Sequence, residues 1–314
     1  MATYGIKRLL QAAPVVVLAS IAVFAILHLV PGDPAVNLAG VNASRQDVQT
    51  IRRRLGLDHP LPQQYLIWVG NAVRGNLGTS FETDQSVVAA IQQAAGPTVE
   101  LALAAYLLAL AIGIPFGALA GMRTRSLWDW GLAGFTTAAV GVPHFVLGLA
   151  LLYVVSFRLG WLPIGGQVSL FSNPLQSLRY LALPALTLGL GHAAVLARFV
   201  RVAVSQVMHQ DYIRTARAKG LGERTVIVRH ALRNGLTAVI TVAALQVAGL
   251  LAGVVVIENV FSRPGIGRLV VDAIRARDYP VVQGVLLVLV MLFICVNLIA
   301  DLAYGLIDPR IRAA

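Results

Sequence analysis

Six long apolar runs occupy most of this 314-residue sequence. They lie approximately at Leu9–Val30, Pro97–Ala120, Trp130–Phe157, Tyr180–Val204, Leu236–Ile257 and Val281–Ile307. Each run has the roughly 20 residues that an α-helix needs to cross a hydrocarbon core about 30 Å thick. Because a lipid-embedded backbone must satisfy its polar groups without water, only helices and closed barrels span a bilayer. The runs therefore predict an all-α membrane protein with about six transmembrane helices.

The composition excludes most soluble classes. Charged residues make up 12% of the chain and hydrophobic residues 57%, whereas a soluble domain carries roughly 25% charge. The net charge of +11 does not predict nucleic-acid binding, because apolar blocks separate the basic residues. The single cysteine, Cys295, forms no intrachain disulfide or metal cluster, and the six histidines lack metal-ligand spacing.

The chain divides into three predicted parts. Residues 1–30 hold the N-terminus and a first helix, whose apolar run is too long for a cleaved signal peptide. Residues 31–96 form an extracytoplasmic insert with helix-like stretches at Asp47–Leu55 and Gln63–Val73. Residues 97–314 form a five-helix core with a cytoplasmic loop at 205–235.

Basic residues in the short loops predict that both termini are cytoplasmic. With that orientation the inside positions are Lys7, Arg8, Arg123, Arg125, Arg198, Arg201, Arg214, Arg217, Lys219, Arg224, Arg229, Arg233, Arg310 and Arg312. A cluster between the last two runs, Arg263, Arg268, Arg275 and Arg277, opposes this orientation, although nearby acidic residues offset it.

Within the cytoplasmic loop, the stretch Gln210–Leu221 contains a predicted helix of roughly eight residues. Asp211 is placed to cap its N-terminus. Arg217 and Lys219 fall in the last turn, where the helix dipole favours cations, and Gly220 can end the helix in a left-handed conformation. Ala216 and Ala218 keep the helix thin, which suits a contact with another protein. The alternative is an arginine-rich loop that only sets topology.

This loop resembles the cytoplasmic coupling motif of bacterial ABC importer permeases, whose general pattern is E-A-A-x3-G-x9-I-x-L-P. Gly220 and Leu232 occupy the glycine and leucine positions. Arg214 and Thr215 replace Glu and Ala, and His230 and Arg233 replace Ile and Pro. These departures resemble the dipeptide, oligopeptide and nickel branch, with T-A-R-A-K-G-L at 215–221 and H-A-L-R-N at 230–234.

Further stretches resemble the same branch in the expected order. They are Leu55–Asp58 with Pro60, Gly75–Gly78, Glu258–Phe261 with Pro264–Gly267, Asp278–Pro280 and Asp308–Arg310. The resemblance covers nearly the whole chain and implies a type I ABC importer transmembrane domain in the bacterial inner membrane.

The resemblance also implies partners. They are a second, related permease, two ATP-binding subunits, an extracytoplasmic substrate-binding protein and the surrounding membrane lipid. The chain has no G-x-x-x-x-G-K-[ST] phosphate loop, so we expect no enzyme activity and no cofactor in this chain, with ATP and Mg bound by the partners. The residues implied to contact the ATPase are Asp211, Tyr212, Arg214, Thr215, Ala216, Arg217, Ala218, Lys219, Gly220, Leu221 and Leu232.

Polar residues inside the runs are candidates for the transport pathway. The candidates are His144 and Gln246. The alternative for His144 is a packed, hydrogen-bonded histidine, and the alternative for Gln246 is a helix–helix hydrogen bond. Glu100 and Asp301 lie near membrane boundaries and can instead reach the interface. The implied substrate is a short peptide, with nickel complexes, glutathione or another small solute as alternatives. A stand-alone carrier or a membrane-embedded enzyme would need ionisable or catalytic residues within the membrane spans. The predicted spans of this chain are poor in such residues.

Overall fold

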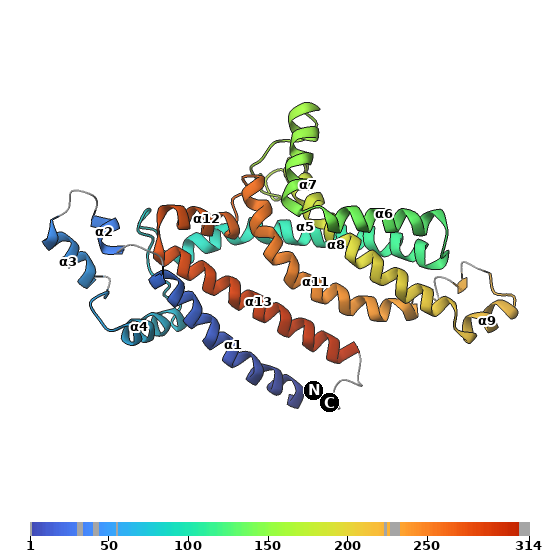
Figure 1. Ribbon diagram of the computed structural model, residues 1–314, viewed down its shortest axis with the longest axis horizontal. Helices are drawn as coiled ribbons and strands as arrows, with labels where there is room; N and C mark the ends of the chain where they lie inside the picture. The colour runs from blue at the N-terminus through green and yellow to red at the C-terminus, as the bar shows by residue number, and fades with distance from the viewer. Residues whose placement is uncertain are drawn as a thin grey trace. The chain divides into compact units, whose positions relative to one another are not determined.

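The computed structural model describes residues 2–29, 34–39, 44–54, 56–222, 225–226 and 233–307 (Figure 1). In this part of the chain the regular elements are helices, and the only β-type pairing is one isolated bridge between Thr79 and Ser86. The predicted all-α class is confirmed.

The described chain forms two compact units. The first contains Met1–Gly96 and Gly265–Leu298, and the second contains Pro97–Pro264 with the residues after Leu298. Helix α5 (Val87–Met122) gives its first ten residues to the first unit and the remainder to the second.

Within the first unit, short helices follow the long α1. The elements are α1 (Ala2–Leu29), α2 (Pro34–Ala39), α3 (Arg45–Arg54), α4 (Leu61–Val73), α12 (Ile266–Ala276) and most of α13 (Tyr279–Ile307). Helices α3 and α4 coincide with the two helix-like stretches predicted in the insert. The N-terminus of α3 is a reciprocal cap: Asp47 N–H donates to Ser44 Oγ, and Ser44 N–H donates to Asp47 Oδ2. These hydrogen bonds hold the pKa of Asp47 below its usual value.

Aromatic and aliphatic contacts join the parts of this unit. Tyr65 of α4 hydrogen-bonds Ser20 of α1 at 2.8 Å, and the Phe24 ring lies 5.5 Å from the Tyr65 ring. A separate buried cluster joins the start of α5 to α12 and α13, and its members are Val87, Ile91, Ile266, Val270, Ala273, Val281, Val282 and Val285.

The second unit is arranged around α8. Its elements are the remainder of α5, α6 (Leu127–Gly141), α7 (His144–Leu151), the π-helix η1 (Leu152–Arg158), α8 (Pro174–Met208), α9 (Asp211–Ala218) and α11 (Arg233–Val260). Helix α8 contacts α6, α7 and α11. Its buried residues, including Leu188, Leu196 and Val200, are almost completely shielded.

Helix α8 approaches α5 along a row of glycines. Gly113, Gly117 and Gly121 recur at intervals of four residues, which places them on one face of α5. A Cβ added at Gly113 would lie 2.9 Å from the carbonyl oxygen of Ala193, and one at Gly121 would lie 2.6 Å from that of Arg201. Small residues at such positions let membrane helices pack through their backbones.

The described residues contain four helices that are long and apolar enough to cross a membrane. They lie at Val87–Met122, Pro174–Met208, Val242–Val260 and Tyr279–Ile299. Helix α1 contributes a shorter apolar stretch at Leu10–Ala25. Helix α6 with the α7–η1 segment is a fifth span if the bent pair counts as one.

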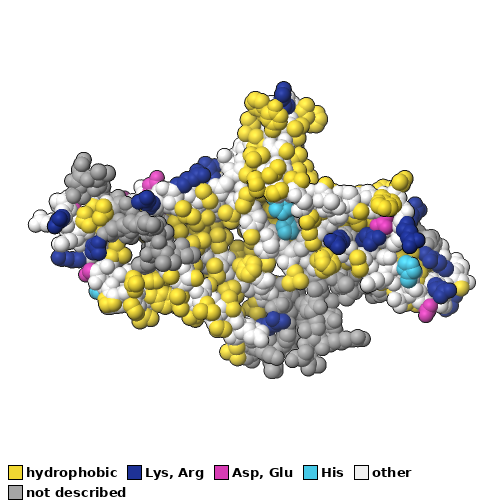
Figure 2. All heavy atoms as spheres, in the orientation of Figure 1, with side chains coloured by type: hydrophobic (Ala, Val, Ile, Leu, Met, Phe, Trp, Pro, Cys, Tyr) yellow, Lys and Arg dark blue, Asp and Glu magenta, His cyan; other side chains and the backbone are white. Residues whose placement is uncertain are grey.

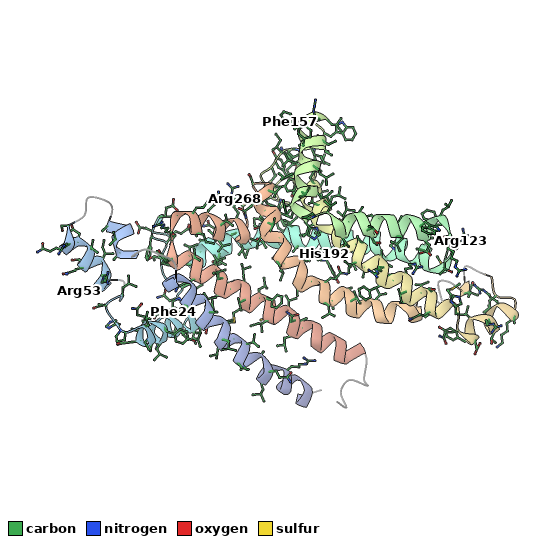
Figure 3. The ribbon with its side chains drawn as sticks, viewed as in Figure 1. Phe24, Arg53, Arg123, Phe157, His192 and Arg268 are labelled. Atoms are coloured by element: carbon green, nitrogen blue, oxygen red, sulfur yellow. The ribbon has the colours of Figure 1, made fainter. Side chains whose placement is uncertain are left out.

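The bend in that pair corrects one expectation. The run Trp130–Phe157 was expected to form one span, but its two helical halves are inclined by 99°. Val142 is extended (φ −99°, ψ 122°) because it precedes Pro143, and proline disfavours a helical residue before it. A new helix then begins at His144. Hydrophobic side chains cover the α7–η1 segment (Figure 2), and Phe157 near its end is 68% exposed (Figure 3).

We predict that Gly117→Ala destabilises the protein. The added methyl group would overlap the carbonyl oxygen of Ala197 and the side chain of Val200, and overpacking of this kind costs roughly 1–3 kcal/mol. The thermal midpoint of the detergent-solubilised protein should fall by several degrees.

The matched control is Gly134→Ala in α6, where an added Cβ meets no atom within 4 Å. Equal thermal midpoints for both variants would show that the α5–α8 contact does not depend on the glycines.

Candidate functional site

Helix α9 follows directly on α8 and has well-defined ends. Gln210 is its N-cap, with no side-chain hydrogen bond. Asp211 was expected to be the cap, but it is the first helical residue, where its charge still favours the helix dipole. At the other end, Gly220 N–H donates to Arg217 O and Leu221 N–H donates to Ala216 O. This is the Schellman arrangement, and the φ of +77° at Gly220 confirms the predicted left-handed end.

The inward face of α9 is small and apolar. Ile213 is fully buried and Ala216 is 6% exposed. Both pack in a cluster with Val226 and with Val207 and Met208 of α8. Of the two alanines that were expected to keep the helix thin, Ala216 faces the protein and Ala218 is exposed.

The outward face of α9 carries the other predicted contact residues. The exposed positions are Asp211, Tyr212, Arg214, Thr215, Arg217, Ala218, Lys219, Gly220 and Leu221. Arg214 Nη1 lies 3.6 Å from Asp211 Oδ1, and both side chains are largely solvent-accessible. Three cations against one carboxylate make this face basic. Leu232 lies outside the described residues, as does most of the helix predicted near 223–233.

A second polar cluster lies among α7, α8 and α11. His192 Nδ1 and Gln246 Oε1 are 3.0 Å apart, which joins α8 to α11. The ring of His144 stacks on that of His192 with centroids 6.1 Å apart and an interplanar angle of 11°. A side chain at Gly191 would overlap the His144 ring, so only glycine lets the imidazole lie against α8.

This cluster contains both predicted pathway residues and one that was not singled out. Gln246 makes the helix–helix hydrogen bond that was its alternative role. His144 Nδ1 is buried without a hydrogen-bond partner in the described part of the chain, so it retains unused hydrogen-bonding capacity. His192 was missed because a histidine in an apolar run gives no indication of its partners until the helices are placed together.

A third cluster is a buried ion network at the start of the α5 span. Arg263 is completely buried, and its Nη2 lies 2.6 Å from Glu100 Oε2. Thr98 Oγ1 donates to Glu258 Oε1 at 2.6 Å, and Glu258 is also fully buried. Burial lowers the pKa of Arg263, while the charges of Glu100 and Glu258 oppose that shift.

The network was not predicted from the sequence. Glu100 was interpreted as a pathway or interfacial acid, whereas its carboxylate pairs with Arg263 and accepts a hydrogen bond from Gln167. Arg263 is one of the arginines that opposed the proposed orientation, and its charge is paired within the protein. The side chain of Asp301 is not among those described.

Comparison with known families agrees with this architecture. Residues 113–313 match the family described as binding-protein-dependent transport system inner membrane component, and residues 1–102 match the corresponding N-terminal family. The chain belongs to this family. It is accordingly an integral inner-membrane permease, and the resemblance found in its motifs is confirmed.

Relatives of this permease align over its full length. A Sinorhizobium fredii protein named as a permease for peptide ABC transport is 40% identical over 99% of this chain and 100% of its own length. A Brucella abortus protein named as a permease of a peptide transport system is 43% identical over 98% of both chains. The glutathione transport system permease protein GsiC of Escherichia coli O6:H1 is 41% identical over 99% of both chains.

Solved structures share the fold of the permease at low sequence identity. The inward-facing MetNI methionine ABC transporter matches with a TM-score of 0.57 at 17% identity, over 69% of this chain and 96% of that one. An amino acid ABC transporter with histidines matches with a TM-score of 0.53 at 13% identity, over 68% and 92%. The expected type I importer fold is therefore confirmed.

We predict that Arg263→Met strongly destabilises the permease. The substitution leaves Glu100 and Glu258 without their counter-charge, and breaking a buried pair costs about 3–5 kcal/mol. Arg268→Met is the control, because Arg268 and Asp272 form a partly exposed pair with an N–O distance of 3.4 Å, and such pairs contribute roughly 0–1 kcal/mol. Thermal unfolding in detergent compares the two, and equal losses would contradict a structural role for the buried network.

Proposed function

We propose that this permease forms half of the translocation pathway of an ATP-driven importer for short peptides. The observation that carries the proposal is α9, a capped basic helix whose two inward side chains attach it to the end of α8. Such a helix can transmit movement from a bound protein to a membrane span. The full-length similarity to relatives named for peptide transport supports the substrate class.

In this proposal the outward face of α9 fits into a partner ATPase. The contact residues are those of the exposed face together with Leu232, while Ala216 supports the helix from behind. The complex would hold a second, related permease, two ATP-binding subunits and an extracytoplasmic substrate-binding protein. ATP and Mg would be bound by the partners, and this chain would carry no catalytic site or cofactor.

The proposed topology has both termini and α9 on the cytoplasmic side. The segment at residues 31–96 would then be extracytoplasmic and would help to dock the binding protein, followed by the permease core from residue 97 with its coupling loop at 205–235. The arginines around α9 support this orientation through the positive-inside rule. On the opposing side, Arg263 is buried and its charge is paired with Glu100.

We also propose that the histidine–glutamine cluster contacts the solute. His144, His192 and Gln246 gather hydrogen-bonding groups among three helices, and peptide amides need such partners when they leave water. Glutathione is the second candidate solute, because the relative named for glutathione transport is as similar as those named for peptides.

The proposal is tested by co-purification and reconstitution. The tagged permease should retain a phosphate-loop ATPase from mild detergent, and the complex in proteoliposomes should hydrolyse ATP faster when the binding protein and a dipeptide are added. Uptake of labelled dipeptide and of labelled glutathione, measured side by side, decides between the two solutes. A permease that purifies without an ATPase, yet transports after reconstitution alone, would contradict the proposal.

We predict that Gly220→Val impairs transport. A β-branched residue is poorly tolerated at the φ of +77°, and a side chain in this region costs roughly 1–2 kcal/mol. The end of α9 would shift, so dipeptide uptake should fall several-fold while the subunits still co-purify.

Gly222→Val is the matched control. It lies two residues further along, an added Cβ there meets no atom within 4 Å, and its φ lies outside the left-handed region. Uptake with Gly222→Val should match that of the unmodified complex. Equal uptake by both variants would show that coupling does not depend on the end of α9.

A further inference from the structure

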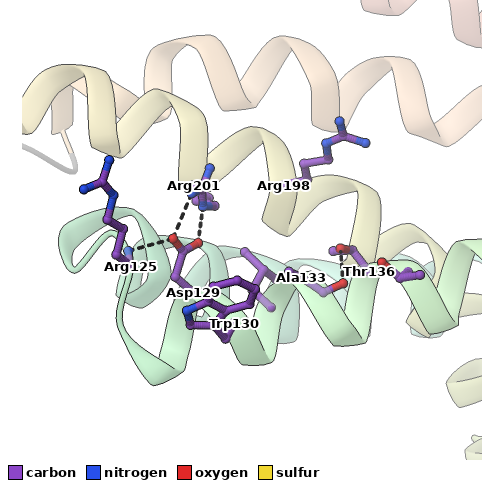
Figure 4. A pocket seen from close by; sticks show the side chains of 9 residues that line it. Arg125, Asp129, Trp130, Ala133, Thr136, Arg198 and Arg201 are labelled. Carbon is purple, nitrogen blue, oxygen red and sulfur yellow. Dashed lines mark hydrogen bonds and ion pairs between the residues drawn. The ribbon is translucent and has the colours of Figure 1, made fainter.

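A groove runs between α6 and α8 and is not used by the proposed transport cycle. It consists of two adjoining cavities of about 490 and 640 Å³. Thr136, Thr137 and Arg198 line both cavities, so the two adjoin, and Figure 4 shows the residues that line the first. The whole groove lies within the second compact unit.

One end of the groove carries an excess of positive charge. Arg125, Arg198 and Arg201 line it, and Asp129 is the only carboxylate among the described residues that do so. That carboxylate is already engaged, because Asp129 Oδ2 accepts from Arg201 Nη2 at 2.9 Å and from the Arg125 backbone N–H at 2.9 Å. Arg198 lines the groove, its guanidinium has no hydrogen bond or ion pair within the described residues, and Figure 4 shows it pointing away from Asp129.

The other end of the groove is apolar. Val140, Val195, Phe199 and Val202 line it, and each is between 37% and 65% exposed. At the charged end, the Trp130 ring is 73% exposed. Tryptophan and arginine concentrate at the membrane–water interface, where headgroups lie. The groove therefore combines cationic and apolar side chains. On α6 its lining passes from Asp129 and Trp130 to Val140, and on α8 Arg198 and Arg201 lie among Val195, Phe199 and Val202.

We propose that this groove binds an anionic phospholipid. Its phosphate would lie against Arg198 and the neighbouring arginines, since guanidinium groups form strong charge-assisted hydrogen bonds with phosphate. One acyl chain would follow the apolar residues along α8. A free phosphate would leave the apolar half uncovered, and a zwitterionic lipid would not match the excess charge, so the two ends together select an anionic lipid. The inference does not depend on which solute is transported.

The test is native mass spectrometry of the complex purified from membranes that contain phosphatidylglycerol and phosphatidylethanolamine. The unmodified complex should retain phosphatidylglycerol in preference. Arg198→Gln should lower that retention about tenfold, since the lost hydrogen bonds to phosphate are charge-assisted. Arg123→Gln is the matched control. Arg123 follows the last residue of α5 and is exposed, but it does not line the groove.

A second variant tests the apolar half. Val140→Trp fills the groove from an exposed position without removing a charge, so it should also displace the lipid while the subunits stay assembled. Retention unchanged in both variants would overturn the proposal. Displacement of the lipid by inorganic phosphate alone would also overturn it, because that result indicates an anion site. Loss of the second permease from the Arg198→Gln complex with the lipid retained would overturn it as well, because that result indicates a subunit contact.

Discussion

The backbone contact between α5 and α8 is the constraint on which the second compact unit depends. In a bilayer, water release does not drive helices together, so association relies on close packing. Three glycines at four-residue intervals bring α5 within reach of the α8 carbonyl groups. Once α8 is held there, it offers its remaining faces to α6, α7 and α11. The two sites that we connect with transport both depend on α8. His192 of the histidine–glutamine cluster belongs to this helix, and α9 follows directly on its end.

Local sequence rules predicted the parts of the structure that depend on neighbouring residues. The apolar runs became helices, the insert contains α3 and α4 where its sequence is helix-like, and Gly220 ends α9 in a left-handed conformation. These features follow from residues only a few positions apart. The bend after α6 also follows from a neighbouring residue, because Pro143 disfavours a helical conformation at Val142. The length of the apolar run alone did not predict this break.

Features that join distant positions could not be predicted in this way. Arg263 and Glu100 are separated by 163 positions, and His192 and Gln246 by 54. An isolated charge in a sequence is consistent with a free surface group, a topology determinant or half of a buried pair. Ala216 illustrates the same limit on a smaller scale, since the face of α9 that turns inward is decided by Val207, Met208 and Val226. The placement of helices, rather than any single residue type, decides these roles.

The contrast between Arg263 and Arg214 has a consequence for ionic conditions. Dissolved ions screen exposed charges over about 10 Å at 0.1 M salt but reach buried pairs far less. The Arg263–Glu100 pair is shielded, whereas Arg214 and Asp211 on α9 are open to solvent. Raising the salt concentration should therefore leave the Arg263–Glu100 pair intact while it weakens the contact that we propose between α9 and a partner ATPase. The internal structure of the permease and its proposed attachment to a partner would thus respond differently to the same change of ionic strength.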